Sequence, residues 1–173
     1  MNAQRTIRNL AIVLLLSSTI GCDQVSKIVV RKHVADYEQI GLIHPYLTLT
    51  KVENTGAFLS LGNSLPQPLK ILLLVILPML ALMYALIYLF IKTNLSWLRI
   101  VGICFIIGGG IGNIYDRLMY GSVTDFLHID LGIVQTGIFN IADVAVMAGV
   151  ILLFINTSID RSKVTPIRSE DNP

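Results

Sequence analysis

The sequence predicts a mainly α-helical membrane protein, built as a bundle of four transmembrane helices with a small extramembrane β-sheet. The first observation is composition: 54% of the residues are hydrophobic and 14% are charged, and the mean hydropathy is +0.71. These values lie outside the range of an ordinary soluble domain. The second is a series of apolar stretches long enough to cross about 30 Å of hydrocarbon. The 173 residues form a single membrane domain, with spans at about 10–30, 69–91, 98–114 and 138–155.

The first span, residues 10–30, has two interpretations. It opens with an uncharged run, Leu10–Cys22, that also has the length of a signal-peptide core, and Thr19–Cys22 resembles the cleavage site of bacterial lipoproteins. We favour an uncleaved helix, because the rest of the chain crosses the membrane several times and needs no lipid anchor. Near the end of this helix, Asp23 and Lys27 are four residues apart, so they share one face and can form an ion pair.

The polar section after the first span predicts the sheet. Residues 46–52 alternate apolar and polar side chains, which is the pattern of a strand. Asn54 and Gly56 then mark a turn, and residues 57–61 offer a return strand. We expect a β region at about 40–62 that rests on the bilayer surface.

The three later spans occupy most of the chain from residue 69 to residue 155. Pro78 lies inside the second span and can kink that helix, which bilayer helices tolerate. Trp97 precedes the third span as an interfacial anchor, and the glycines of the third span allow helix backbones to approach closely in lipid. A second external loop, residues 115–137, leads to the last span. The polar tail, residues 156–173, is predicted to be disordered.

An even number of spans places both ends of the chain on the same side of the membrane. Seven of the 13 basic residues fall on that side, in the shorter segments, so the positive-inside rule makes both termini cytoplasmic. These seven are Arg5, Arg8, Lys92, Arg99, Arg161, Lys163 and Arg168. Asp125 and Asp143 then face outward, together with the sheet.

Asp125 and Asp143 are the strongest candidates for function. We place each at the mouth of an apolar helix, where a carboxylate is costly unless it is paired, hydrogen-bonded or hydrated. The loop Leu127–Ile138 can bring the two side by side. Two carboxylates held close share one proton, and such a pair can hydrolyse a peptide bond by activating water. Spacing alone leaves structural acids and an ion-coupling pair open as alternatives.

Polar residues near this pair complete the candidate site. Asn113, Asp116 and Arg117 are grouped at the end of the third span, and we expect Arg117 to pair with Asp116. Asn140 precedes the second aspartate by three residues, so its side-chain amide can orient that carboxylate. Asn54 can reach the site only if the sheet folds over it.

Several other chemistries find no support in the sequence. A net charge of +2 is too small and too dispersed for a nucleic-acid partner. Cys22 and Cys104 lie in apolar stretches, which predicts free thiols, and they show no metal-ligand spacing. The glycine-rich stretch 108–112 lacks the Lys-Ser/Thr of a phosphate-binding loop, and no serine has a histidine partner at a telling spacing. We expect no cofactor and no metal.

Five blocks of the sequence together resemble the signature blocks of the bacterial lipoprotein signal peptidases, or type II signal peptidases. In chain order they are Asp23–Lys27, Asn54–Phe58, Gly109–Arg117, Val123–Phe126 and Phe139–Asp143. The resemblance implies an aspartic endopeptidase of the bacterial inner membrane, with four helices, a periplasmic β-cradle and a catalytic pair at Asp125 and Asp143. Its substrates would be prolipoproteins whose cysteine already carries diacylglycerol, cut just before that cysteine.

The same resemblance implies a set of residues that shape the substrate site or support the catalytic pair. They are Asp23, Lys27, Asn54, Gly56, Asn113, Arg117, Val123, Asn140 and Ala142, to which we add Asp116 from the third block. The sequence departs from the family pattern at Tyr115, where an aliphatic residue is more usual, and in the loop Leu127–Ile138, which has few aromatic residues. These departures concern substrate preference more than chemistry.

The partners implied are the lipid-modified signal peptide and membrane lipids, and we expect a monomer. Two other classes of protein stay open. A small ion- or proton-coupled transporter would use Asp23, Asp125 and Asp143 as a relay, and a membrane assembly factor would bind a partner through the external sheet.

Overall fold

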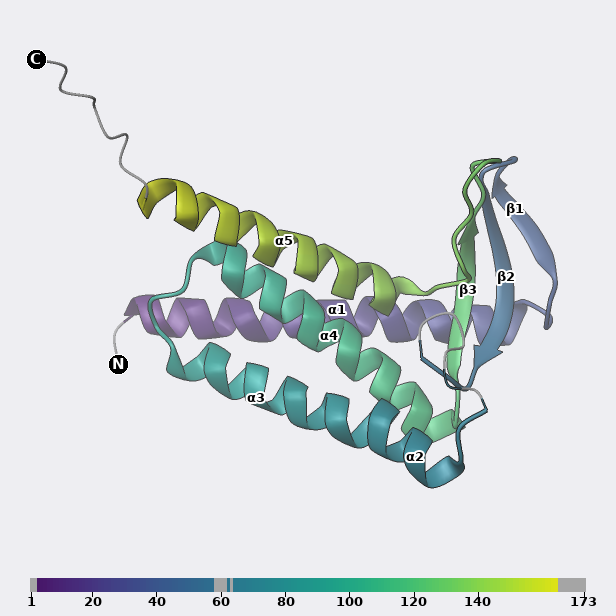
Figure 1. Cartoon of the computed structure of the whole chain (residues 1–173), viewed down its shortest axis with the longest axis horizontal. Coiled ribbons are helices and arrows are strands. Elements are labelled where there is room, and N and C mark those ends of the chain that lie inside the picture. Colours follow the sequence, from purple (N-terminus) through teal and green to yellow (C-terminus); the bar gives the residue numbers. More distant parts are fainter. Residues whose placement is uncertain (1–2, 58–61, 63, 165–173) are drawn as a thin grey trace, which may run out of the picture.

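A bundle of long helices carries a three-stranded sheet across one of its ends (Figure 1). The computed structural model describes residues 3–57, 62 and 64–164. Within these residues, four helices are long and apolar enough to cross a membrane, which confirms the predicted fold class. The four are Ala3–His33, Gln67–Ile91, Trp97–Tyr120 and Ile141–Asp160. The first helix begins and the last helix ends at the same end of the bundle, opposite the sheet (Figure 1).

The second span is interrupted near its start. It consists of α2 (Gln67–Ile71), a π-helical turn η2 (Leu72–Ile76) and α3 (Leu77–Ile91). Pro78 has no N–H to donate to the carbonyl four residues earlier, so a regular α-helical ladder has a gap there. The wider π turn lies directly before this proline, and it is the form that the predicted irregularity takes.

Helix α4 (Trp97–Tyr120) extends six residues beyond the predicted third span, 98–114. The added turns contain Asp116 and Arg117, which lie beyond the predicted end of the span. Both side chains have partners inside the structure, so the helix continues through them. It ends at Gly121, whose φ of +76° is the left-handed conformation that glycine adopts without strain.

Helix α5 (Ile141–Val164) begins three residues later than predicted and continues into the predicted tail. Asn156 is buried and contacts the Ser96 hydroxyl, and Asp160 accepts a 2.8 Å hydrogen bond from Arg99. These contacts hold the last turns of α5 against the start of α4. The predicted disorder is therefore wrong for residues 156–164, and the rest of the tail lies outside the described residues.

The sheet has the order β1-β2-β3, and both pairings are antiparallel. Its strands are β1 (Gln39–Ile43), β2 (Leu47–Asn54) and β3 (Val123–Ile129). The alternating segment 46–52 forms β2 as predicted, but most of the proposed return strand 57–61 lies outside the described residues. The second external loop predicted over 115–137 is only partly a loop, because this segment holds the end of α4 and the whole of β3.

Two glycines of α4 let the other helices approach its backbone. A Cβ atom on Gly109 would lie 2.4 Å from the carbonyl oxygen of Ala142, at the start of α5. A Cβ on Gly112 would lie 2.3 Å from Oδ2 of Asp23, on α1 (Ala3–His33). Because neither glycine has a side chain, α1, α4 and α5 bring their polar residues together at the sheet end of the bundle.

Candidate active site

Asp125 lies in the middle of β3, and the residue is 4% exposed. The prediction that it stands at the mouth of a helix is therefore wrong. Oδ2 accepts a 3.0 Å hydrogen bond from the side-chain amide of Asn54, at the end of the neighbouring strand β2. Oδ1 accepts a 2.7 Å hydrogen bond from the side-chain amide of Asn140. The sheet thus folds over the site and brings Asn54 to it. The sequence predicted that Asn54 could reach the site only with this arrangement.

Asp143 lies in the first turn of α5. Its Oδ2 accepts a hydrogen bond from the main-chain N–H of Asn140, whose side-chain oxygen in turn accepts one from the N–H of Asp143. This reciprocal arrangement is a capping box, and it fixes the carboxylate at the positive end of the helix dipole. Oδ1 accepts a 2.9 Å hydrogen bond from the amide of Asn113. The main chain of Asn140, and not its side chain as predicted, therefore orients Asp143.

The two aspartates line one small cavity with a volume of about 20 Å³. Its other lining residues are Asn54, Ala57, Asn113, Arg117, Val123 and Ile138. A volume of roughly 10–15 Å³ accommodates one water molecule, provided that polar groups surround it. The structure therefore places two carboxylates, one from a strand and one from a helix, around a space that suits a single water.

Burial raises the pKa of Asp125 from its ordinary value of 3.8 to about 6. The hydrogen bond from Asn54 lowers this pKa, the neighbouring charge of Asp143 raises it, and the hydrogen bond from Asn140 lowers it. The net result is a carboxyl group that holds its proton more tightly than a solvent-exposed aspartate does. A proton can therefore stay between the two carboxylates when the solution is only weakly acidic.

Arg117 contributes the cation of this cavity. It donates a 2.7 Å hydrogen bond to the carbonyl of Gly56 and a 3.2 Å hydrogen bond to the carbonyl of Asn113. The predicted pair with Asp116 is wrong, because adjacent residues on a helix point in different directions. Asp116 instead faces α1. Arg117 thereby holds the turn after β2 against α4 and places a positive charge beside the two aspartates.

A buried ion network supports the cavity from the side of α1. Lys27 donates hydrogen bonds of 2.9 Å both to Asp23 and to the side-chain oxygen of Asn113, and its Nζ lies 3.0 Å from Asp116. The side chains of Lys27, Asp23 and Asp116 are all fully buried. The predicted pair of Asp23 and Lys27 is confirmed. Asp23 also accepts a 3.0 Å hydrogen bond from the main-chain N–H of Ala142, which fixes the start of α5.

Two charged residues that the sequence analysis did not select extend this network. Arg31 lies 3.0 Å from Asp116, donates to the hydroxyl of Thr124 and covers the ring of Tyr120. Glu53, on β2, accepts hydrogen bonds from the hydroxyls of Thr124 and Ser122. Helical spacing could have indicated Arg31, because it lies four residues after Lys27 on the same face. Nothing local indicates Glu53, whose partners are about 70 positions away along the chain.

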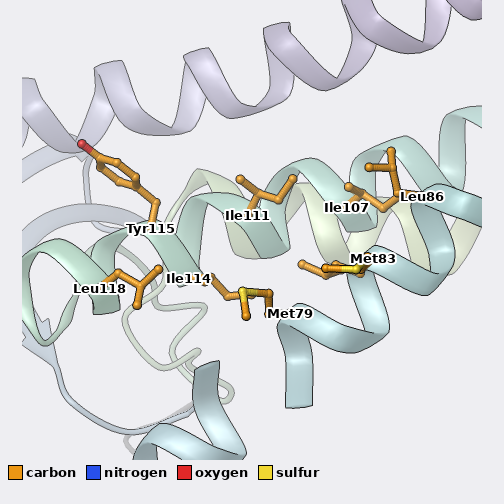
Figure 2. A pocket seen from close by; sticks show the side chains of 9 residues that line it. Met79, Met83, Leu86, Ile107, Ile111, Ile114, Tyr115 and Leu118 are labelled. Atoms are coloured by element: carbon orange, nitrogen blue, oxygen red, sulfur yellow. The ribbon is translucent and has the colours of Figure 1, made fainter. Parts of the chain in front are cut away.

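An apolar groove of about 350 Å³ lies between α3 and α4. Figure 2 shows Met79 of α3 near Ile114 of α4, and Met83 of α3 near Ile107 of α4. The full lining is Met79, Leu82, Met83, Leu86, Ile107, Ile111, Ile114, Tyr115 and Leu118. Ile114 and Leu118 directly follow Asn113 and Arg117 of the polar cavity along α4, so the groove extends to the level of that cavity on a different face of the helix. Among the described residues, no cluster of three or more His, Cys, Asp or Glu could hold a metal ion.

Known proteins are similar to this chain in both sequence and fold. Residues 13–159 match the sequence profile of signal peptidase II. A lipoprotein signal peptidase of Clostridioides difficile (strain 630) is 35% identical over 87% of this chain and 97% of its own length. One from Streptococcus pyogenes serotype M1 is 35% identical over 83% of this chain and 90% of its own.

The fold is also similar to that of a bacterial membrane enzyme solved by the in meso method at 2.3 Å resolution. The TM-score is 0.80 at 27% sequence identity, and the match covers 92% of this chain and 94% of the other. The arrangement of helices and sheet is therefore shared over nearly the whole chain.

Proposed function

The chain belongs to the signal peptidase II family of hydrolases that cleave signal peptides from prolipoproteins, and from that premise we propose its chemistry and its cleavage site. It is an aspartic endopeptidase that cuts the signal peptide from diacylglyceryl-modified prolipoproteins, just before the lipidated cysteine. Asp125 and Asp143 are its catalytic residues. The observation that carries this proposal is the cavity that both carboxylates line, with room for one water.

The reaction uses the two carboxylates as one unit with a single shared proton. The ionised member takes a proton from the water, which attacks the scissile carbonyl carbon. The protonated member donates to the carbonyl oxygen, and a proton then passes to the leaving amine as the tetrahedral intermediate collapses. No bond forms between the substrate and the enzyme. The raised pKa of Asp125 supports this division, because it keeps a proton at the pair.

The amide groups around the pair act as its supports. Asn54 and Asn140 each donate to a different oxygen of Asp125, and Asn113 donates to Asp143. The remaining lone pairs are free to face the water and the peptide. Arg117, which holds the turn at Gly56, stabilises the negative charge that develops during the reaction. Strand β2 ends beside this turn, so an extended substrate peptide can pass along the turn.

The groove between α3 and α4 receives an acyl chain of the substrate. Its lining is entirely apolar, and the two methionines can adapt to a flexible chain. Because it reaches the catalytic end of α4, a diacylglyceryl group bound there leaves its cysteine near the aspartates. We also propose that both termini are cytoplasmic, that the site faces the periplasm and that the enzyme acts as a monomer.

The decisive experiment is cleavage of a diacylglyceryl-modified precursor peptide by the purified protein, followed by mass measurement. The expected products are the free signal peptide and a fragment that begins with the lipidated cysteine. We expect Asp125→Asn and Asp143→Asn to abolish cleavage while the protein still inserts into the membrane. Asp36→Asn is the matched control, because Asp36 is exposed, its ion-pair partner in the described structure is Lys51, and neither residue lines the cavity.

Substantial turnover by either active-site variant would refute the two-aspartate mechanism. The transporter alternative would require acids spread through the depth of the membrane. Asp23, Asp116, Asp125 and Asp143 instead gather at the sheet end of the bundle. The same variants test the assembly-factor alternative, which would tolerate the loss of either aspartate.

A further inference from the structure

A second polar cavity lies at the opposite end of the bundle from the aspartates. It has a volume of about 430 Å³ and is lined by Gln4, Arg5, Arg8, Thr93 and Asn94. These residues come from the start of α1 and from the segment that joins α3 to α4 (Figure 1). The reaction proposed above uses none of them.

Arg8 is the unusual residue of this cavity, because it is a cation that is only 8% exposed. Its Nη2 donates to the carbonyl oxygens of Leu89 and Lys92, at the end of α3. Its Nε and Nη1, which carry three of the five N–H groups of a guanidinium, have no acceptor among the described residues. A buried charge without a counter-ion is costly. The contacts with α3 therefore satisfy only some of the hydrogen-bond donors of the Arg8 guanidinium.

The charge around Arg8 is positive. Arg5 lines the same cavity one helical turn earlier, and the first acidic residue of the whole sequence is Asp23. Asp160, on the same side of the bundle, is already paired with Arg99. The lining thus combines two guanidinium groups with a hydroxyl and two side-chain amides, and no acid among the described lining residues opposes an anion.

The position of the cavity indicates where such an anion would come from. The apolar run of α3 ends at Ile91, and that of α1 begins at Leu10. Arg8 and Thr93 therefore lie just beyond the hydrocarbon, at the level of lipid headgroups. Arginine binds phosphate through two parallel hydrogen bonds, and the free N–H groups at the start of a helix add further donors.

We propose that this cavity is a phosphate-binding site, centred on Arg8 and Arg5, at the end of the bundle that carries the termini. The phosphate is the diester of an anionic phospholipid or a free phosphate ion, since the same donors recognise both. Binding there compensates the charge of Arg8 and ties the start of α1 to the end of α3.

The test is a thermal-unfolding titration of the purified full-length protein in a neutral detergent. Three probes are added separately: dihexanoyl phosphatidylglycerol, inorganic phosphate and dihexanoylglycerol, which has no phosphate. We expect phosphatidylglycerol to raise the unfolding midpoint in a saturable manner, as a ligand of the native state does. Dihexanoylglycerol should leave the midpoint unchanged. An equal shift with dihexanoylglycerol would overturn the proposal, because the phosphate would then contribute nothing.

Variants connect this shift to the cavity. Arg5→Gln removes an exposed charge that makes no contact needed for folding within the described structure, and it should weaken phosphatidylglycerol binding about fivefold. Arg8→Gln should weaken binding further. If Arg8→Gln fails to fold because α3 loses its cap, Arg5→Gln still decides the question. Arg99→Gln is the control, since Arg99 lies at the same end but outside the cavity, and it should bind as the wild type does.

The outcomes separate the two sources of phosphate. Saturation by inorganic phosphate with the same dependence on Arg5 supports a site for the free ion. Response to phosphatidylglycerol alone, with that dependence, supports a lipid headgroup. Equal binding by wild type and Arg5→Gln, or no binding of either phosphate probe, would overturn the site. None of these results depends on cleavage, so the proposed catalytic function stands or falls separately.

Discussion

The ammonium group of Lys27 donates a 2.9 Å hydrogen bond to the side-chain oxygen of Asn113. The same oxygen accepts a 3.1 Å hydrogen bond from Asn140. Because both donors occupy the oxygen, the amide nitrogen of Asn113 must face the other way, where it donates to Asp143. Lys27 lies on α1 and does not line the cavity of Asp125 and Asp143, yet it determines which group Asn113 presents to the carboxylate of Asp143.

The first prediction follows from this relationship. Lys27→Met removes the cation that lies between the buried carboxylates of Asp23 and Asp116. Breaking a buried ion pair in this way costs about 3–5 kcal/mol in the free energy of unfolding, and the Asn113 amide loses the donor that orients it. We expect a lower unfolding midpoint in detergent and a large loss of kcat in the cleavage assay.

Lys51→Met provides the control for Lys27→Met. The side chain of Lys51 is 14% exposed, but its partner Asp36 is 69% exposed, and an ion pair with one member open to solvent in this way is worth about 0–1 kcal/mol. The unfolding midpoint and the kcat of Lys51→Met should stay near those of the wild type. Similar effects of the two substitutions would show that the buried network has no special role in orienting the site.

The second prediction concerns the dependence of stability on pH. The pKa of Asp125 is about 6 in the folded protein and 3.8 in its ordinary state, so between these values the folded protein binds the proton more tightly. The stability from this group is fully present below pH 3.8 and is lost as the pH rises through 6. The two pKa values correspond to about 3 kcal/mol. Wild type should therefore unfold at a lower temperature at pH 8 than at pH 5, and Asp125→Asn should show a smaller difference.

The same proton affects the reaction. If the pair needs one shared proton, kcat/KM for a lipid-modified peptide should fall as the pH rises through about 6, because kcat/KM reports the ionisation of the free enzyme. The assay is a series of initial rates between pH 4 and pH 9 (about one unit apart) in buffers of constant ionic strength. A rate that rises throughout this range would contradict the shared proton.

Local sequence patterns predicted the helices of this fold and some of the site. The length of the apolar stretches was sufficient to predict the four spans. A spacing of four residues was sufficient to predict the ion pair of Asp23 and Lys27. These features depend on residues that are close along the chain. The spans and this ion pair therefore follow from the sequence without knowledge of the neighbouring elements.

The parts that were not predicted depend on partners far away in the chain. Asp125 lies in a strand because β3 pairs with β2, where Val52 is its register partner. Such a pairing leaves only a short alternating pattern in the sequence. The sequence predicts that Arg117 pairs with Asp116, whereas the helix directs Asp116 toward Lys27 and Arg117 toward Gly56. Predicting these contacts requires the crossing of α1 and α4 and the fold of the sheet.

The third prediction tests the close approach of α4 and α5. A methyl group on Gly109 would lie 2.4 Å from the carbonyl oxygen of Ala142 and 2.9 Å from the side chain of Val146. The carbonyl belongs to the backbone, so the helices must separate, and Gly109→Ala should cost about 1–3 kcal/mol. The shift also moves Asp143, which is next to Ala142. We expect a lower unfolding midpoint and a loss of cleavage.

Gly21→Ala is the matched control for Gly109→Ala. A methyl group on Gly21, in α1, would have no neighbour within 4 Å among the described residues. Alanine forms helices better than glycine by about 1 kcal/mol, so this variant should be as stable as the wild type or more so. Equal losses in both variants would mean that the effect comes from glycine itself and not from the contact with α5.

The fourth prediction tests the groove between α3 and α4 as the site of an acyl chain. Met83→Trp places a bulky ring in the groove without removing any polar contact, whereas Leu80→Trp adds the same ring to a half-exposed position of α3 outside the groove. If the ring excludes about two methylene groups of the substrate, binding weakens by about 1.6 kcal/mol, which is roughly tenfold. KM should therefore rise for a dipalmitoyl-glyceryl peptide with Met83→Trp but not with Leu80→Trp.

A dibutanoyl-glyceryl peptide, whose chains are too short to fill the groove, should be cleaved equally by both variants. Equal KM values for the long-chain substrate in the two variants would place the acyl chains elsewhere on the protein, while the two-aspartate mechanism would be unaffected.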